Sequence, residues 1–154
     1  MDPLTDLALT LARPDQGEAI GELTRRAYAK WLPVIGREPR PMTIDYAAAL
    51  GEHRFDLHYQ GETLVGLIET ADEGDALLIV NIAVAPEAQG QGIGRALVAH
   101  AEALARSLGR WRVRLYTNKL FAENVRLYER LGYRTYDETT DPALGTTVYM
   151  VKPL

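Results

Sequence analysis

The sequence has 154 residues, enough for one domain that buries about two thirds of its surface. Charged residues make up 25% and hydrophobic residues 47%, and a net charge of −4 with both signs interspersed argues against nucleic acid or an anionic membrane as partner. The absence of cysteine excludes disulfides and thiolate metal sites, and the three histidines, His53, His58 and His100, lack metal-ligand spacing. No apolar run approaches the roughly 18 residues of a membrane span, and Met1–Leu4 lacks the basic segment of a signal peptide. We therefore expect a cytoplasmic protein without a metal.

The first half of the chain carries the signals of short strands, two helices and one irregular segment. Asp15 is the expected cap of the first helix, and Thr43 is the expected cap of a second, shorter one. Gln60-Gly61-Glu62 separates two alternating segments and predicts a β-hairpin. Three prolines and a glycine predict an irregular loop over residues 31–42. The expected strands cover residues 7–12, 53–60, 63–70 and 76–84, and the expected helices cover residues 15–27 and 43–50.

The second half alternates helices with strands. A helix from Ile93 has its apolar residues on one face, and His100, at the edge of that face, is expected to be a packing residue. The order of elements predicts an α/β (α+β) fold, with about six or seven strands in a mixed, mostly antiparallel sheet, about four flanking helices and a single domain over residues 1–154. The expected helices cover residues 93–108 and 118–131, and the expected strands cover residues 111–117, 133–138 and 146–152.

The most informative stretch is Gln89-Gly90-Gln91-Gly92-Ile93-Gly94-Arg95, which follows the strand at 76–84 and leads into a helix. Its alternating glycines allow backbone angles that a side chain would forbid, so successive N–H groups can converge on one point. The unpaired amides and the positive dipole end of the helix make that point favourable for phosphate. A glycine turn that only packs a helix closely on a sheet is the alternative.

Two common phosphate-binding motifs do not fit this turn. A P-loop ends Gly-Lys-Ser/Thr, whereas this turn ends Ile93-Gly94-Arg95. A dinucleotide fingerprint counted from Gly90 would need glycine in place of Arg95, and an acidic residue where the next strand ends Leu115-Tyr116-Thr117. The remaining pattern, Gln-x-x-Gly-x-Gly behind Ile82-Ala83-Val84-Ala85-Pro86, resembles the acyl-CoA pyrophosphate loop of the GCN5-related N-acetyltransferase (GNAT) family.

A second stretch carries the same resemblance. Residues 115–133 contain Asn124-x-x-x-Tyr128 followed by Leu131-Gly132-Tyr133, which is similar to a second motif of these acetyltransferases. Two motifs in the right order, separated by a helix and a strand, are more specific than either alone. In addition, Gly36 to Tyr46 resembles a subgroup that bears Gly-Arg-x-Pro-x-Pro-Met-x-x-Asp-Tyr.

The resemblance implies an acetyl-CoA-dependent N-acetyltransferase that moves an acetyl group to a primary amine by direct attack in a ternary complex. The end of the strand before the turn would pair with the pantetheine arm, and the glycine turn would wrap the pyrophosphate. Asn124 would hold a pantetheine amide, and Tyr128 would be the general acid; the alternative for Tyr128 is a core aromatic residue. A homodimer is the habit of the family. The implied cofactor-binding residues are Ile82, Ala83, Val84, Gln89, Gly90, Gln91, Gly92, Ile93, Gly94, Arg95, Asn124 and Tyr128.

The chain departs from the family at the catalytic base. Many relatives carry a glutamate on the strand before the glycine turn, whereas the available positions here are Leu78, Val80 and Asn81. Glu69, at the end of the preceding strand, is the nearest carboxylate by topology; the alternative is a solvated strand-end charge. With a single serine, Ser107, and no cysteine, a covalent enzyme intermediate has poor candidates.

The nature of the acceptor is indicated by the proline-bearing loop. Arg37 and Arg40 should border the acceptor side and suit a carboxylate, so we expect a small amine that bears a carboxylate, with Asn81 as a further contact. Solvated loop charges are the alternative. Two other function classes stay open: a non-catalytic acyl-CoA-binding module, favoured by the missing strand glutamate, and a structural or partner-binding domain on the same fold.

Overall fold

The computed structural model describes residues 7–154, so Met1–Leu4, which bear on the leader prediction, lie outside the described residues. The chain forms a seven-stranded sheet in the order β1-β2-β3-β4-β5-β7-β6. Neighbouring strands are antiparallel except β4 and β5, which are parallel, and the predicted α/β fold is confirmed. The strands are β1 (Thr10–Leu11), β2 (Arg54–Gln60), β3 (Thr63–Asp72), β4 (Ala76–Val84), β5 (Arg112–Asn118), β6 (Arg134–Asp141) and β7 (Gly145–Pro153).

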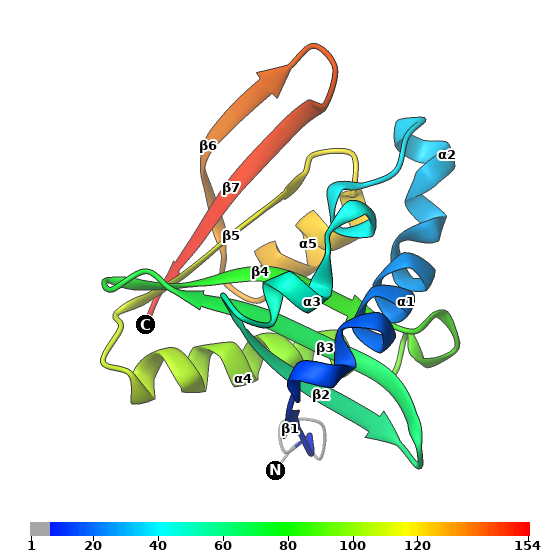
Figure 1. Ribbon diagram of the computed structural model, residues 1–154. Coiled ribbons are helices and arrows are strands. Elements are labelled where there is room, and N and C mark those ends of the chain that lie inside the picture. Colours follow the sequence, from blue (N-terminus) through cyan, green and yellow to red (C-terminus); the bar gives the residue numbers. More distant parts are fainter. Residues whose placement is uncertain (1–6) are drawn as a thin grey trace.

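Helices cover both faces of the sheet (Figure 1). α1 packs on β3, β4 and α3, while α4 lies along the other face against β3, β4 and β5. Among residues 7–154, no helix is long and apolar enough to cross a membrane. The helices are α1 (Gly17–Tyr28), α2 (Leu32–Ile35), α3 (Tyr46–Ala49), α4 (Ile93–Ser107) and α5 (Ala122–Arg130), and short 3-10 turns cover Pro14–Gln16, Ala29–Trp31, Arg40–Thr43 and Pro86–Ala88.

The start of α4 is held close to the sheet. Ile93 and Leu97 are buried on the face of α4 that packs against β3, in agreement with the apolar face predicted for this helix. Gly66 on β3 permits this approach, because a Cβ atom built there would lie 3.1 Å from the Ile93 side chain and 3.8 Å from that of Leu97. The sheet therefore fixes the position of the glycine turn that precedes α4.

Two predicted helix caps are wrong. Asp15 lies inside a 3-10 turn and its Oδ1 pairs with Arg13 Nε at 3.2 Å, so it does not cap α1. Thr43 ends another 3-10 turn, and Asp45 caps α3 by accepting a hydrogen bond from the Ala48 N–H at 3.2 Å. In both places the 3-10 turn occupies residues that were expected to start the helix.

The prediction also differs from the structure at two connecting segments. The helix expected from Asn118 begins at Ala122, because Asn118 is still paired with Thr147 as the last residue of β5. The segment 31–42, expected to be irregular, consists largely of short helical turns. Its first residue, Trp31, is buried and stacks on Phe121 with ring centroids 4.5 Å apart. This contact anchors the segment near the start of α5.

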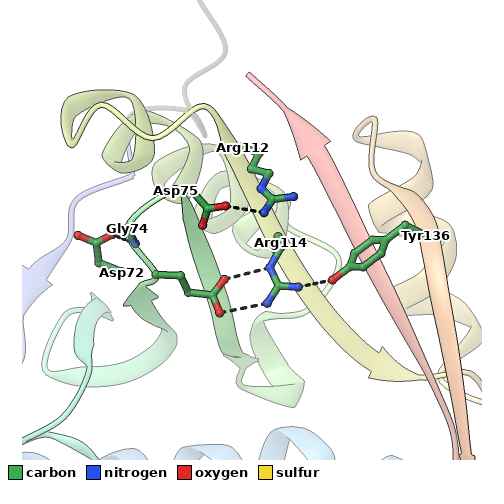
Figure 2. A network of polar contacts seen from close by, with 7 residues as sticks. Asp72, Gly74, Asp75, Arg112, Arg114 and Tyr136 are labelled. Atoms are coloured by element: carbon green, nitrogen blue, oxygen red, sulfur yellow. Dashed lines mark hydrogen bonds and ion pairs between the residues drawn. The ribbon is translucent and has the colours of Figure 1, made fainter.

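A network of ion pairs joins the turn between β3 and β4 to β5 and β6 (Figure 2). Arg114 donates to both carboxylate oxygens of Glu73, at 2.9 and 3.0 Å, and to the hydroxyl of Tyr136. Arg112 donates to Asp75 at 2.7 Å. The network lies at the end of the sheet at which β4 and β5 are paired.

Candidate active site

The glycine turn leads directly into α4. Gly90 and Gly92 both have φ 82, in the left-handed region that residues with a Cβ rarely adopt. Gly92 is the N-cap of α4 and has no side chain that could satisfy the first N–H groups of the helix. At Gly94, in the first turn, a Cβ atom would approach only Leu127, at 4.0 Å. The turn therefore presents backbone donors and the positive end of a helix dipole in an uncrowded position.

β4 and β5 part in the middle of the sheet. Their parallel pairing ends at Ile79 and Leu115, whereas β3 stays paired with β4 as far as Val84. The register between β3 and β4 shifts beside Glu69, so that Val80 is the extra residue of a bulge. Beyond this bulge, the edge of β4 that faces away from β3 has no partner strand among the described residues.

Two backbone carbonyl groups along this unpaired edge accept hydrogen bonds from side chains. The Ile82 carbonyl accepts a hydrogen bond from the Tyr28 hydroxyl at 3.3 Å. The Val84 carbonyl accepts one from the side-chain amide of Gln89 at 3.0 Å. An extended ligand laid along β4 could replace these side chains as a hydrogen-bonding partner.

A cavity of about 430 Å³, the first cavity, opens beside this edge and is bounded by α1, β4, the glycine turn and α5. Two predicted cofactor-binding residues lie outside its lining. Ala83 is 1% exposed and packs in the core, and the Gln91 side chain accepts a hydrogen bond from Gln60 at 3.0 Å. The predicted residues in the lining are Ile82, Val84, Gln89, Gly90, Gly92, Ile93, Gly94, Arg95, Asn124 and Tyr128.

A second, larger cavity of about 850 Å³ lies between the loop after α2, α3 and strands β3, β4, β5 and β7. Tyr28, at the end of α1, lines both cavities. The structure thus gathers most of the residues predicted to bind acetyl-CoA in one cavity and the residues predicted at the amine-acceptor site in an adjoining one. The predicted residues in the second cavity are Arg37, Arg40, Glu69 and Asn81.

Glu69 is 3% exposed, so the alternative of a solvated strand-end charge is wrong. Its Oε2 lies 2.6 Å from Nδ1 of His53, which directly precedes β2. Burial raises the pKa of Glu69, and the hydrogen bond with His53 offsets part of that rise. Both side chains line the second cavity. A carboxylate and an imidazole therefore act there as a unit.

Asn81 on β4 lies opposite Glu69 on β3 in the strand register, and both the oxygen and the nitrogen of its side-chain amide form hydrogen bonds. Its Oδ1 accepts from the Tyr28 hydroxyl at 2.8 Å, and its Nδ2 donates to Tyr46 Oη and Thr24 Oγ1, each at 3.4 Å. Burial raises the pKa of Tyr28 and of Tyr46, so both hydroxyls keep their protons at neutral pH. Asn81 therefore fixes the orientation of the tyrosine that the two cavities share.

The two arginines of the loop have different surroundings. Arg37 donates from Nη2 to the Leu144 carbonyl at 2.5 Å and from Nη1 to the Glu38 carbonyl at 3.1 Å. Arg40 is exposed, and within residues 7–154 its guanidinium makes no ion pair. Arg37 therefore builds the wall of the second cavity, whereas Arg40 offers a free cation at it.

Comparison with known proteins agrees with this geometry. The family described as "Acetyltransferase (GNAT) domain" matches residues 52–135, more than half of the chain. The chain belongs to the GNAT acetyltransferase family. A mycothiol acetyltransferase of Thermobispora bispora is 34% identical over 122 residues, which are 78% of this chain and 37% of that protein. The GNAT chain thus spans little more than a third of the length of this curated relative.

Solved structures show the same GNAT fold. PaiA N-acetyltransferase from Thermoplasma acidophilum, in complex with coenzyme A, has a TM-score of 0.80 at 19% identity and covers 96% of this chain and 100% of its own. The ribosomal-protein-S18-alanine N-acetyltransferase from Escherichia coli has a TM-score of 0.76 at 23% identity and covers 95% and 94%. The family match confirms the predicted GNAT family, and these neighbours, one of them solved in complex with coenzyme A, share its fold.

Tyr128 lies on α5, one turn after Asn124, and both line the first cavity. Its ring packs edge-on against Tyr133 with centroids 6.1 Å apart. Burial raises the pKa of Tyr128 to about 12. The hydroxyl is therefore protonated at neutral pH and is available as a donor in the cavity.

The sequence reasoning missed two residues of this GNAT site, Tyr28 and His53. A signal for His53 was present, because folding the predicted hairpin back with Gln60 opposite Thr63 brings His53 near Glu69, although the bulge between His58 and Tyr59 shifts the exact pairing by one residue. Tyr28 had no comparable signal. Its place between the cavities depends on how α1 packs on β4, which no local pattern encodes.

Proposed function

We propose that this chain is an acetyl-CoA-dependent N-acetyltransferase that transfers the acetyl group to a primary amine by direct attack within a ternary complex. The observation that carries the proposal is the pair of cavities that share Tyr28, one lined by the glycine turn and the other by Glu69 and the loop arginines. Donor and acceptor would enter from different sides and meet where β4 and β5 part.

The first cavity suits acetyl-CoA. The first N–H groups of α4 suit phosphate oxygens, and Lys30 and Arg95 in the cavity lining add positive charge. The unpaired edge of β4 suits a pantetheine arm added as an extra strand, with the Ile82 and Val84 carbonyls as acceptors. When acetyl-CoA binds, an N–H group of the pantetheine would replace the Gln89 side-chain amide as the hydrogen-bond donor to the Val84 carbonyl.

The second cavity suits a small amine that bears a carboxylate. Glu69 supplies negative charge for the amino group, and Arg40, which makes no ion pair within residues 7–154, supplies positive charge for the carboxylate. Arg37 is already engaged with two backbone carbonyls, so its role is to hold the cavity wall. The lining also offers aromatic surface from Tyr46, Tyr116, Phe121 and Tyr149.

The reaction needs no covalent enzyme intermediate. The amine nitrogen attacks the thioester carbonyl carbon, a C–N bond forms, and the C–S bond breaks as the thiolate leaves. Tyr128 donates a hydrogen bond to the sulfur as negative charge develops on it. Ser107 lines neither cavity; it lies exposed at the end of α4, where its hydroxyl donates to the Leu104 carbonyl at 2.7 Å.

A non-catalytic acyl-CoA-binding module would need only the first cavity. The second cavity, with a buried carboxylate beside an imidazole, favours an enzyme instead. Burying an ionisable group costs free energy, and such groups are common at catalytic sites. The subgroup defined by residues 36–46, a homodimer and a cytoplasmic location stay predictions.

Acetyl-CoA-dependent thiol release tests the proposal. The chain is incubated with acetyl-CoA and a panel of primary amines with and without a carboxylate, and released thiol is measured with a disulfide reagent. The chain contributes no thiol of its own because it has no cysteine. We expect turnover with a subset of the carboxylate-bearing amines and the matching acetylamine by mass spectrometry. Thiol release without an acetylated amine, or no release with any amine, would contradict the proposal.

A further inference from the structure

The second cavity contains a pair of residues, Glu69 and His53, of which the sequence predicted only Glu69. The side chain of Glu69 on β3 is 4% exposed, and that of His53, just before β2, is 30% exposed. The carboxylate is thus the more buried member of the pair and the imidazole the more exposed one, and both side chains line the second cavity. This arrangement resembles an orienting acid behind a base that faces a reactant.

The contact between the two residues determines the tautomer of the imidazole. Nδ1 of His53 and Oε2 of Glu69 are 2.6 Å apart, so one proton lies between them. An ionised carboxylate only accepts hydrogen bonds, so Nδ1 must then be the donor. In the neutral imidazole, Nε2 is consequently the nitrogen with a free lone pair.

We propose that His53 is the catalytic base for the acceptor amine and that Glu69 is its positioning residue. The inference rests on the proposed function and deepens it. The acceptor arrives as an ammonium ion, and His53 Nε2 takes one of its protons while the nitrogen lone pair forms the C–N bond. A second proton passes from that nitrogen to the departing thiolate, which leaves as a thiol. The imidazolium returns its proton to water after the product leaves, so each turnover releases one proton.

Glu69 stabilises the positive charge that His53 acquires when it takes the proton. An imidazolium beside Glu69 gives the buried carboxylate a counter-ion, which the neutral imidazole does not. Glu52, next to His53 in the sequence, also lines the cavity and adds negative charge near an arriving ammonium ion. Tyr28 from α1 and Tyr46 from α3 interact electrostatically with Glu69. The other titratable or charged groups in the lining are Arg37, Glu38 and Arg40 from the loop, Tyr116 from β5 and Tyr149 from β7.

The chain offers a matched control histidine. His58 lies on β2 only five residues from His53, but it lines neither cavity, and its Nδ1 lies 3.0 Å from the Ala8 carbonyl. A glutamine at this position therefore tests the loss of an imidazole without touching the proposed site.

Steady-state kinetics over pH 6 to 10 test the proposal, using an amine that the wild-type chain acetylates. His53→Gln should lower kcat/KM for the amine by about 100-fold or more at pH 7, within the range of general-base effects. The loss should shrink at high pH, where the amine is already deprotonated. Glu69→Gln should lower the plateau and move the acid limb of kcat/KM to lower pH, because the imidazolium loses its counter-ion. His58→Gln should leave the profile unchanged.

Nitrogen NMR of the imidazoles gives a readout that does not depend on activity. The wild-type protein should show His53 protonated at Nδ1 and bare at Nε2 at pH 8, and Glu69→Gln should alter that tautomer balance. A wild-type His53 that is protonated at Nε2, or an unchanged acid limb in Glu69→Gln, would overturn the proposal even if His53→Gln failed to fold. Full activity of a folded His53→Gln would do the same. If the wild-type chain acetylates no amine, the proposed function falls as well; if only the variant results disagree, the base assignment falls alone.

Discussion

Arg37 Nη2 donates to the Leu144 carbonyl at 2.5 Å and thereby ties the loop after α2 to the turn between β6 and β7, across 107 residues of sequence. Both residues line the second cavity. Because this bond shapes the wall, we expect Arg37→Gln to raise KM for every acceptor to a similar degree, by about three- to tenfold. Steady-state kinetics with paired amines that differ only in a carboxylate measure this. A loss confined to the carboxylate-bearing amine would show that Arg37 contacts the acceptor directly.

Arg40 should behave differently, since within residues 7–154 it makes no ion pair. We expect Arg40→Gln to raise KM about tenfold for an amine that bears a carboxylate, and to leave the paired amine without one unchanged. The effect should weaken with added salt because the side chain is exposed. Equal effects on both amines would rule out a carboxylate contact at Arg40.

The extent to which the sequence predicted the site follows from where each residue lies. The glycine turn directly precedes α4, and Asn124 and Tyr128 lie one turn apart on α5, so local patterns were enough to single out residues that line one cavity. The bulge at Val80 was invisible, because a buried apolar run has no periodicity from which an extra residue can be read. Its consequence, the separation of β4 from β5, is a property of strand register rather than of composition.

The misplaced caps have a related cause. Thr43 and Asp45 are both good capping residues, and the choice between them depends on the 3-10 turn that ends at Thr43, where its hydroxyl donates to the Arg40 carbonyl at 2.8 Å. This local competition shifts a helix start by a few residues without changing the fold. Tertiary packing, by contrast, determined the position of Tyr28 between the cavities, and no pattern along the chain predicted it.

Gly94 is the position that most directly tests whether the pyrophosphate of acetyl-CoA binds at the start of α4. Its φ is not in the left-handed region, unlike that of Gly92, and a Cβ atom there would have room. Gly94→Asp and Gly94→Asn add side chains of the same size, but only the first adds a negative charge. We expect Gly94→Asp to weaken acetyl-CoA binding by roughly tenfold or more relative to Gly94→Asn, through repulsion of the pyrophosphate.

The fold should tolerate both Gly94 variants. Glycine has a lower helix propensity than either aspartate or asparagine, and an acidic residue in the first turn interacts favourably with the helix dipole. Calorimetric titration with acetyl-CoA and thermal unfolding provide the two measurements. Equal affinities of the two variants would place the pyrophosphate away from the start of α4.

Asp56 provides a prediction about stability and pH. It is buried on β2, its Oδ2 lies 2.9 Å from Arg54 Nε and 3.2 Å from His100 Nε2, and it lines neither cavity. Burial raises the pKa of Asp56, but the contacts with His100 and Arg54 outweigh it, so the pKa is lowered on folding. The stabilisation is therefore present above the unfolded value of about 3.9 and is lost as the pH falls through the lower folded value.

Asp56→Asn should lower the free energy of unfolding by about 1–3 kcal/mol at pH 7, because it leaves partners of a buried carboxylate unsatisfied. The difference from wild type should narrow below about pH 4, where Asp56 of the unfolded chain takes up a proton, and should be lost once the pH falls through the lower folded pKa. Urea unfolding of the wild-type protein and the variant, at pH 7 and below about pH 4, measures this difference in the free energy of unfolding. Asp75→Asn, which removes an exposed carboxylate paired with Arg112, is the control and should have little effect. A gap that stays constant with pH would show that charge at Asp56 does not matter.

Tyr128→Phe tests the role of the hydroxyl at the leaving sulfur. A thiolate resembling that of cysteine has a pKa of about 8.5. Because burial raises the pKa of Tyr128 to about 12, complete proton transfer to the sulfur is uphill by roughly 3.5 units, about 5 kcal/mol. The hydroxyl should therefore act as a hydrogen-bond donor that keeps its proton. It should not produce an alkaline limb in kcat below pH 10.

The variant deletes one oxygen and keeps the ring that packs against Tyr133. We expect kcat to fall by roughly 10- to 1,000-fold, with little change in acetyl-CoA affinity, since the contact forms only as charge develops on sulfur. Tyr133→Phe is the matched control, because its hydroxyl donates to Glu102 at 2.9 Å; it should lower stability and leave kcat unchanged. If Tyr128→Phe retains kcat within about threefold while chemistry is rate-limiting, the thiolate leaves without help from this residue, and Tyr128 is a packing residue of the cavity wall.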